Sequence, residues 1–258
     1  GLVGSEMCIR DSPSAMIDVA AAERSEAIHL FTDRARFSNP GFELVDKNAS
    51  SVSTICHMLN GIPLAIELVA SHIKYMAVVT LLERLSERFD RLPSPDPGSV
   101  KRHRTMQAAI EWSYNLLSEE EKTLFRRLSI FVGGFDLVAV EEICASECLP
   151  ADKMLDLLSK LIDKSMIQTI YQPGQEMRYR LLETLQRYAS RLLVEKGEVE
   201  EIRKLHLEYF TRMAKEAFQE QFESAADFIP KLKQENDNLI SALNWADQNS
   251  CLLYTSDA

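Results

Sequence analysis

Apolar residues recur along most of the chain at the spacing of an amphipathic helix. Val52, Ile55, Cys56 and Leu59, for example, stand at i, i+3, i+4 and i+7, which is typical of a helix with one buried face. Ser118 and Glu121 have the spacing of a capping box, which predicts a helix start there. The pattern therefore predicts a mainly α-helical fold, with further helices over residues 24–37, 63–75, 79–92, 105–117, 137–145, 152–163 and 185–192.

Two short β-prone runs interrupt this pattern, at residues 166–171 and 176–181. Pro173 and Gly174 lie between them and favour a turn, so the two runs predict a small hairpin. Helices followed by a small hairpin outline a winged helix-turn-helix. After residue 198 helical spacing returns, and apolar stripes such as Leu239, Ala242, Leu243 and Ala246 predict the start of a TPR-like helical array.

Shifts in composition predict where domains begin and end. Residues 93–99 contain three prolines and a glycine, which do not sustain a helix and read as a linker. Both ends of the chain lack a helical period and resemble translated adapter sequence, so they are predicted to be non-native tails. The predicted order is a tail over 1–12, a helical subdomain over 20–92, a linker over 93–104, a winged-helix subdomain over 105–197, the start of the array over 198–250 and a tail over 251–258.

The composition is that of a globular protein. Apolar residues make up 46% of the chain and charged residues 26%, and no segment approaches the ~20 apolar residues of a membrane span. Five widely spaced cysteines predict reduced thiols in a cytoplasmic protein. A net charge of −10 disfavours non-specific binding of the whole chain to nucleic acid or to an anionic membrane.

Gly61 and Pro63 form the candidate nucleotide contact. Proline suits the first turn of a helix, and it presents a flat apolar ring that a nucleobase could cover. An ordinary junction between a loop and a helix is the competing interpretation. A nucleotide would also need a phosphate-binding loop of the G-x-x-x-x-G-K-[ST] type, which the chain lacks.

No spacing of nucleophiles, histidines or cysteines predicts a catalytic residue or a metal ligand. We therefore expect no enzyme activity from this part of the protein. Arg102 and Arg104 are candidates for a phosphate or interdomain contact, and a solvated linker end is the alternative.

The helix over residues 152–163 is the candidate for reading DNA. It carries the acids Asp152, Asp156 and Asp163 against the bases Lys153 and Lys160. Phosphate contacts require basic side chains, so this balance disfavours direct DNA binding.

Several longer stretches resemble the helical and winged-helix subdomains of STAND or NB-ARC nucleotide switches. The resemblance is closest to bacterial predicted ATPases and LuxR- or SARP-like transcriptional regulators, and more distant to apoptosome and plant-resistance proteins. It rests on residues 25–35, 55–68, 102–106, 111–117, 125–135, 179–189 and 235–246.

The resemblance implies a fragment of a bacterial signal-transduction regulator. The subdomains would close over ATP or ADP with Mg²⁺, held by an upstream P-loop domain that this sequence lacks, and the fragment alone would bind no cofactor. Gly61 and Pro63 would then face the adenine. The downstream repeats would meet a protein or small-molecule effector. The alternatives are a non-catalytic helical interaction module and a winged-helix DNA-binding domain.

Overall fold

The computed structural model describes residues 25–90, 101–171, 176–220 and 232–249. The chain divides into two compact units, residues 1–109 and 110–258, which are described separately. Both predicted tails and residues 93–100 of the predicted linker lie outside the described residues.

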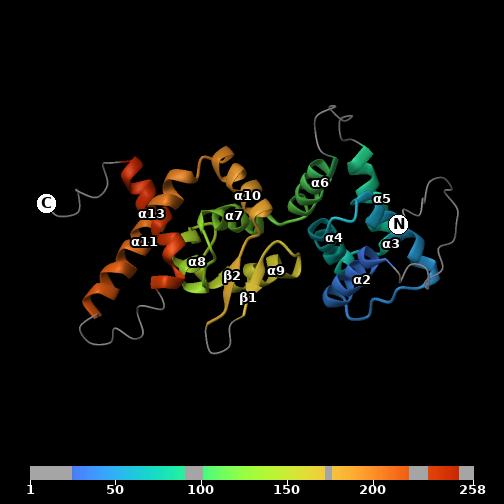
Figure 1. Cartoon of the computed structure of the whole chain (residues 1–258), viewed down its shortest axis with the longest axis horizontal. Coiled ribbons are helices and arrows are strands. Elements are labelled where there is room, and N and C mark those ends of the chain that lie inside the picture. Colours follow the sequence, from blue (N-terminus) through green and yellow to red (C-terminus); the bar gives the residue numbers. More distant parts are fainter. Residues whose placement is uncertain (1–24, 91–100, 172–175, 221–231, 250–258) are drawn as a thin grey trace, which may run out of the picture. The chain divides into compact units, whose positions relative to one another are not determined.

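The first unit is a small bundle of helices around an apolar core. Helix α2 packs against α4 and the 3-10 turn η1, and α3 packs against α5 (Figure 1). Phe31, Leu59 and Ile66 are fully buried within it, as their helical spacing requires. The elements are α2 (Glu26–Ser38), α3 (Asp46–Met58), α4 (Pro63–Ala70), η1 (Ser71–Lys74) and α5 (Val78–Asp90).

One helix of this unit is shorter than its pattern predicts. The predicted helix over 63–75 ends as an α-helix at Ala70, and the chain continues as the tighter turn η1. Such 3-10 turns are common at helix ends. Ile73, the apolar residue of η1, stays buried, so the hydrophobic pattern continues across a change of helix type.

The second unit contains two strands among helices. Helix α6 (Lys101–Asn115) crosses the division between the units and begins inside the segment predicted as linker, because residues 101–104 contain no proline or glycine to stop it. The other elements are α7 (Glu119–Arg127), η2 (Leu128–Ile130), α8 (Leu137–Cys144), η3 (Ala151–Lys153), α9 (Met154–Asp163), β1 (Gln168–Ile170), β2 (Arg178–Arg180), α10 (Glu183–Glu195), α11 (Val199–Glu220) and α13 (Asn236–Gln248).

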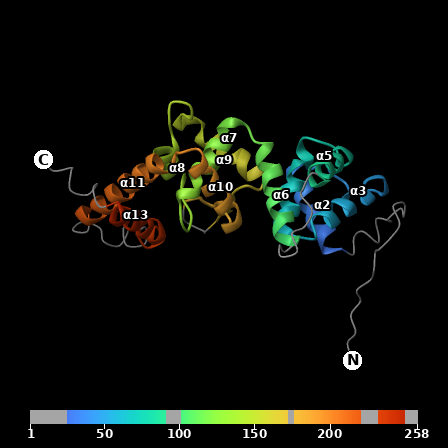
Figure 2. The same ribbon diagram turned by 90° about the horizontal axis from the view of Figure 1, so that it is seen from above.

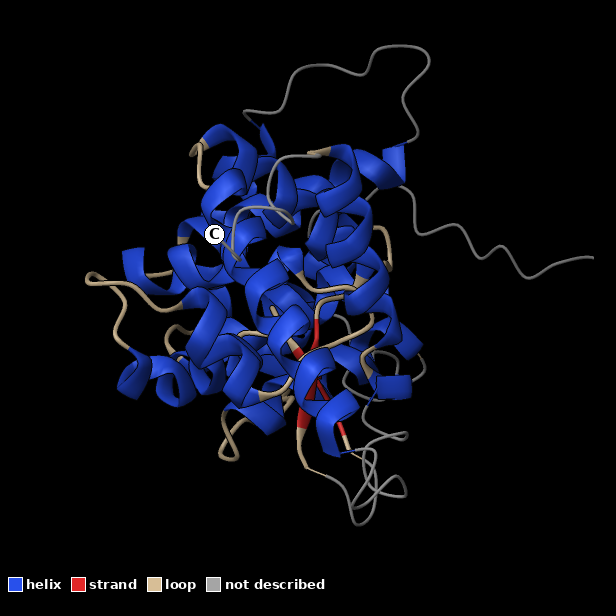
Figure 3. Cartoon of the chain, turned by 90° about the vertical axis from the view of Figure 1, so that its left-hand side faces the viewer, coloured by secondary structure: helices blue, strands red, loops and turns tan. Residues whose placement is uncertain are grey.

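The predicted mainly helical fold with a small hairpin is confirmed (Figure 3). Strands β1 and β2 pair antiparallel with Thr169 opposite Tyr179. Tyr179 also exchanges backbone hydrogen bonds with Phe135, at 2.8 and 2.9 Å, on the other side of β2. The hairpin is thereby attached to the loop that precedes α8.

Helices α11 and α13 lie side by side in both views (Figures 1 and 2). The buried face of α13 includes Ala242 and Ala246 of the predicted stripe, but Leu243 is 61% exposed whereas Asn238 is buried. The helix is rotated so that Asn238 can hydrogen-bond within the core. No helix in the described part of the chain is long and apolar enough to cross a bilayer.

Candidate functional site

A helix, a short loop and a second helix form the candidate nucleic-acid interface. Asp136 caps α8 by accepting a 2.8 Å hydrogen bond from the Ala139 amide, which stabilises the helix start. After α8 ends, Arg127 donates to the Cys144 carbonyl at 2.8 Å and to the Ser146 hydroxyl at 3.1 Å. These bonds attach the start of the loop between α8 and α9 to α7.

Helix α9 is amphipathic, and packing fixes which face it presents. Its inner face is fully or almost fully buried and consists of Met154, Leu157, Leu158 and Leu161. Just beyond its end, Lys164 pairs with Glu121 at 2.7 Å. Glu121 also accepts a 2.7 Å hydrogen bond from the Ser118 amide, which completes the predicted capping box. Packing and the Lys164–Glu121 pair together turn Leu155, Asp156, Ser159 and Lys160 outward.

Lys160 on this outer face and Lys153 at the end of η3 are paired with exposed carboxylates. Lys160 pairs with Asp156 at 2.6 Å, and Lys153 pairs with Glu120 at 2.8 Å. Hydrogen bonds to these carboxylates raise the pKa of both lysines, so both carry a positive charge at neutral pH. Exposed ion pairs of this kind contribute little to stability, which leaves the two ammonium groups able to exchange a carboxylate for a phosphate.

The hairpin adds further polar side chains to the same unit. Arg180 is exposed and donates to Gln168 Oε1 at 3.2 and 3.3 Å across the two strands. Tyr171 and Met177 flank the turn and are 72% and 45% exposed. The turn itself, residues 172–175, lies outside the described residues.

A buried polar network joins the hairpin to α13. Arg178 on β2 forms an ion pair with Glu235, and both side chains are buried. Asn238 donates to Glu235 Oε2 at 2.7 Å and to the Gly134 carbonyl at 2.9 Å, and it accepts from the Val132 amide at 2.7 Å. The hairpin, the loop at 132–134 and α13 therefore form one hydrogen-bonded assembly.

Two glycines allow the loop in this network to pass close to its neighbours. Both have positive φ, +82° at Gly133 and +126° at Gly134, where side chains are disfavoured. A β-carbon at Gly134 would lie 3.0 Å from the Tyr179 carbonyl oxygen, and one at Gly133 would lie 2.8 Å from Asp237 Oδ2.

A second ion-pair cluster connects α7 to Glu198, the residue before α11. Glu198 accepts from Arg126 at 2.5 and 3.0 Å and from Arg127 at 3.0 Å. Burial acts to raise the pKa of Glu198, but the hydrogen bonds from the two arginines outweigh it and lower that pKa. The carboxylate therefore stays charged between the two guanidinium groups at neutral pH.

The nucleotide candidates lie in the first unit. Gly61 has φ +62°, Pro63 is the first residue of α4, and both are exposed. Asn60 donates to the Thr105 hydroxyl at 2.7 Å, which brings this turn next to α6. Arg102 and Arg104 lie on the preceding turn of α6, exposed and half-buried respectively. The roles of these residues stay predictions.

No cluster of three or more histidine, cysteine or acidic side chains suited to a metal ion occurs within the described ranges. The sequence did not single out Arg178, Glu235 or Asn238. They are separated by up to 60 positions in the chain, and only the fold brings them together.

Comparison with known proteins addresses the second unit directly. Residues 117–194 match the model of a winged helix-turn-helix domain. A protein of Mycobacterium tuberculosis named "Putative HTH-type transcriptional regulator" is 39% identical over 224 residues, which cover 87% of this chain and 25% of that protein. A Mycobacterium bovis protein of the same description matches equally well. An uncharacterized M. tuberculosis protein is 35% identical over 179 residues, 69% of this chain and 45% of its own length.

These matches correct one expectation. Direct DNA binding was disfavoured on the acidic balance of residues 152–163, but a winged helix-turn-helix domain and relatives named as HTH-type regulators point to DNA binding. The charge count was a poor guide for a physical reason. Asp163 is half-buried at the end of α9 and does not belong to its outer surface. The exposed ion pairs of Lys153 and Lys160 are weak.

The chain spans about a quarter of the length of the regulators that it matches. The helix, loop, helix and hairpin described above coincide with the matched residues. The chain therefore contains a winged helix-turn-helix domain and is homologous to proteins named as putative HTH-type transcriptional regulators.

Proposed function

We propose that this chain is the winged-helix DNA-binding part of a transcriptional regulator. The observation that carries the proposal is that residues 117–194, matched as a winged helix-turn-helix domain, contain a helix α9 whose exposed outer face carries Asp156, Ser159 and Lys160. In such domains the second helix enters the major groove and flanking groups contact the backbone.

The proposed contacts follow from which side chains face outward. Lys153 and Lys160 would leave their carboxylate partners and pair with phosphates, because a phosphate oxygen is as good a partner as an exposed carboxylate. Ser159, on the same face, is short enough to let the helix approach a base edge. Arg180 and Gln168 on the hairpin would meet the neighbouring backbone as a second point of attachment.

Fluorescence anisotropy with labelled duplex DNA of mixed sequence tests the proposal. Binding in the range of non-specific affinities, a Kd of about 1–100 μM at moderate salt, is expected. Lys153→Gln and Lys160→Gln should each weaken binding and reduce the salt dependence by about one unit of slope.

Lys215→Gln is the matched control, because Lys215 is an exposed lysine on α11. It should bind as the unchanged protein does. Binding of no DNA duplex at low salt, or equal binding by all four proteins, would contradict the proposal.

A second candidate function is the nucleotide switch implied by the family resemblance. Its support is the exposed turn at Gly61 and Pro63, held beside α6 by the bond between Asn60 and Thr105. In this proposal an upstream P-loop domain binds ATP or ADP with Mg²⁺, and the first unit closes over the base. The helices α11 and α13 would begin a TPR-like array.

The switch is tested in a full-length parent that carries a P-loop domain. Pro63→Ala should release ADP faster if the ring covers the base, and Arg102→Ala should do so if the guanidinium reaches a phosphate. Pro40→Ala is the control, because Pro40 is exposed in the loop after α2. Equal ADP retention by the three variants and the parent would reject the switch role of these residues.

A regulator that binds DNA would act in the compartment that contains the chromosome. The proposal therefore includes a cytoplasmic location. The part of the protein in hand is proposed to act by binding rather than by catalysis. Whether the parent hydrolyses ATP would be decided by the upstream domain of the second candidate.

A further inference from the structure

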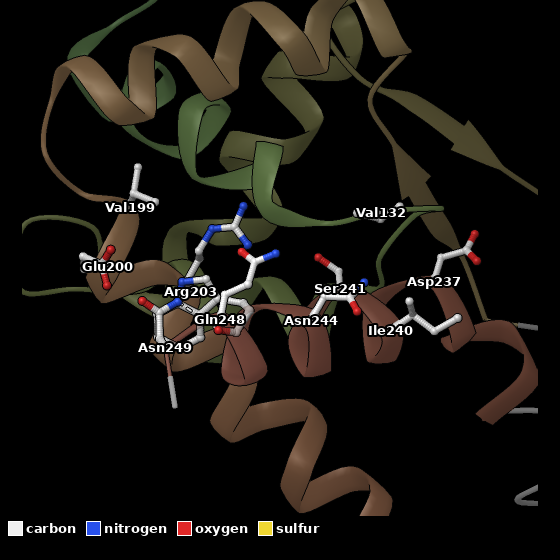
Figure 4. A pocket seen from close by; sticks show the side chains of 11 residues that line it. Val132, Val199, Glu200, Arg203, Asp237, Ile240, Ser241, Asn244, Gln248 and Asn249 are labelled. Carbon is white, nitrogen blue, oxygen red and sulfur yellow. Dashed lines mark hydrogen bonds between the residues drawn. The ribbon is translucent and has the colours of Figure 1, made fainter. Parts of the chain in front are cut away.

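An open pocket runs along α13 and is bounded by the start of α11 and by Val132 (Figure 4). Its volume is about 580 Å³, within the range that small-molecule sites occupy. Its lining includes Val132, Arg203, Ser241, Asn244, Trp245 and Gln248. Residues from the start of α11 and the end of α13 meet here, so the two helices run antiparallel.

The polar groups of the pocket suit a ligand that carries both charges. Arg203 and Gln248 point into the same space (Figure 4). The guanidinium of Arg203 can hold a carboxylate with two parallel hydrogen bonds. Glu200 and Asp237 also line the pocket and can attract an ammonium group.

The remaining lining completes such a site. Ser241, Asn244 and Gln248 add hydroxyl and carboxamide groups that both donate and accept, and Val132 and Trp245 add apolar surface. Polar groups at fixed positions orient a small ligand, and most of the side chains that line this pocket are polar or charged. One cation and two carboxylates match a zwitterion better than a simple anion, which the carboxylates would repel.

The lining is connected to the hairpin. The Val132 amide donates to Asn238, and Asn238 donates to Glu235, the ion-pair partner of Arg178 on β2. Asp237 packs against Gly133 in the same loop. A ligand that contacts Val132 and Asp237 therefore contacts the residues that hold the hairpin in place.

We propose that this pocket binds a small zwitterion of the amino-acid or dipeptide class, and that the bound ligand stabilises the hairpin through Asn238. The consequence for gene regulation rests on the proposed DNA-binding function, whereas ligand binding and its effect on the hairpin do not. Both are measured without DNA, so a failure of the one proposal is distinguishable from a failure of the other.

Binding is tested by thermal shift and then calorimetry, with the free proteinogenic α-amino acids and dialanine as probes at millimolar concentration. At least one probe should raise the Tm and bind saturably. Arg203→Gln should weaken that binding about tenfold or more, as expected for the loss of a charge-assisted bidentate contact. Lys204→Gln, which alters an exposed neighbour on α11, should bind normally.

Three outcomes would overturn the proposed site. They are the absence of binding by any probe, unchanged binding by Arg203→Gln, and equally tight binding of acetate or ethylamine, which carry only one of the two charges.

The connection to the hairpin is tested by amide hydrogen exchange with the best probe. Exchange over residues 166–171 and 176–181 should slow in the unchanged protein. In Asn238→Ser the probe should still bind while the exchange of these segments stays as it is without ligand. If Asn238→Ser does not fold, Arg178→Lys replaces it, because this change keeps the charge but alters the bond between β2 and Glu235 outside the pocket; the probe should still bind and the slowing over residues 176–181 should be reduced. Unchanged exchange in the parent on saturation would overturn the connection.

Discussion

Arg178 on β2 and Glu235 at the start of α13 form an ion pair 57 positions apart in the chain, and both side chains are buried. The pair connects the wing of the winged-helix domain to the helices that follow it. Asn238 binds the second oxygen of Glu235, so the carboxylate is satisfied on both sides. A buried charge that is paired and hydrogen-bonded is tolerated, whereas the same charge alone is costly.

Removing one partner of this pair should destabilise the second unit strongly. Glu235→Gln leaves the Arg178 guanidinium buried without a counter-charge, and we expect a loss of about 3–5 kcal/mol in the free energy of unfolding. Urea unfolding followed by tryptophan fluorescence measures this, since both tryptophans, Trp112 and Trp245, lie in residues 110–258.

The double variant Arg178→Met with Glu235→Gln provides the control for that experiment. It removes both charges, so it should be less destabilised than Glu235→Gln alone. A double variant as unstable as the sum of the two single variants would show that the pair is not coupled.

Because His206 is buried, the free energy of unfolding of the second unit should depend on pH in the acid range. It lies between the rings of Phe131 and Phe210, at centroid distances of 5.8 and 4.6 Å. Burial lowers the pKa of His206 to about 4 from its ordinary value of 6.5. The unfolded chain therefore binds a proton in this interval that the folded chain does not, and stability falls as the pH drops from 6.5 towards 4.

The lowered pKa of His206 corresponds to a loss of about 3 kcal/mol in the free energy of unfolding once the pH has fallen to about 4. His206→Phe should remove this part of the pH dependence, while the carboxylates still contribute below it. No other histidine lies in residues 110–258, so the comparison needs no second histidine variant. Parallel pH profiles of stability for the two proteins between pH 6.5 and 4 would contradict the assignment.

Glu198 gives a second acid-sensitive contact, with a different range. Because its folded pKa is lowered, its contribution is complete above the unfolded value and is lost as the pH falls through the folded pKa. Glu198→Gln should destabilise the unit at pH 7, and this loss should shrink as the pH falls through the folded pKa of Glu198. Glu195→Gln, at an exposed site on α10, should change the unfolding free energy little over the same pH range.

A side chain at Gly134 should weaken the attachment of the hairpin to the loop at 132–134. In Gly134→Ala the new β-carbon would meet the Tyr179 carbonyl at 3.0 Å, in a backbone with φ +126°. Strain of this kind costs on the order of 1–3 kcal/mol, and the contact adds to it.

Gly197→Ala is the reference for a side chain at positive φ that meets no neighbour. Gly197 has φ +71° and no neighbour within 4 Å of an added β-carbon, so only the conformational cost of about 1–2 kcal/mol applies. Unfolding free energies of the two variants should differ, with Gly134→Ala the less stable. Equal losses would mean that the loop relaxes away from Tyr179.

The sequence predicted local structure well because local chemistry determines it. The capping box at Ser118 and Glu121 forms as predicted, and so does the hairpin around Thr169 and Tyr179. The stripe on α13 was predicted in part: Ala242 and Ala246 are buried, but the burial of Asn238 was missed because asparagine counts as polar in any hydrophobic pattern. Its burial depends on partners about a hundred positions away, the Val132 amide and the Gly134 carbonyl.

The candidate interface was harder to predict. The five charged residues of 152–163 can be read from the sequence, but which of them face outward depends on packing beneath α9. The partner of Lys153, Glu120, lies 33 positions away. A count of charges could not distinguish a surface that repels DNA from one whose lysines are paired with exposed carboxylates and could pair with phosphates instead.

The Asn238 carboxamide has consequences for how α13 can sit. Its oxygen faces a donor, the Val132 amide, and its nitrogen faces two acceptors, the Gly134 carbonyl and Glu235. A flipped amide would oppose like poles at every contact, and a carboxylate in its place would repel Glu235. A shift of α13 by one residue along its axis would break all three bonds at once. Asn238 therefore favours one register of α13 against the loop at 132–134.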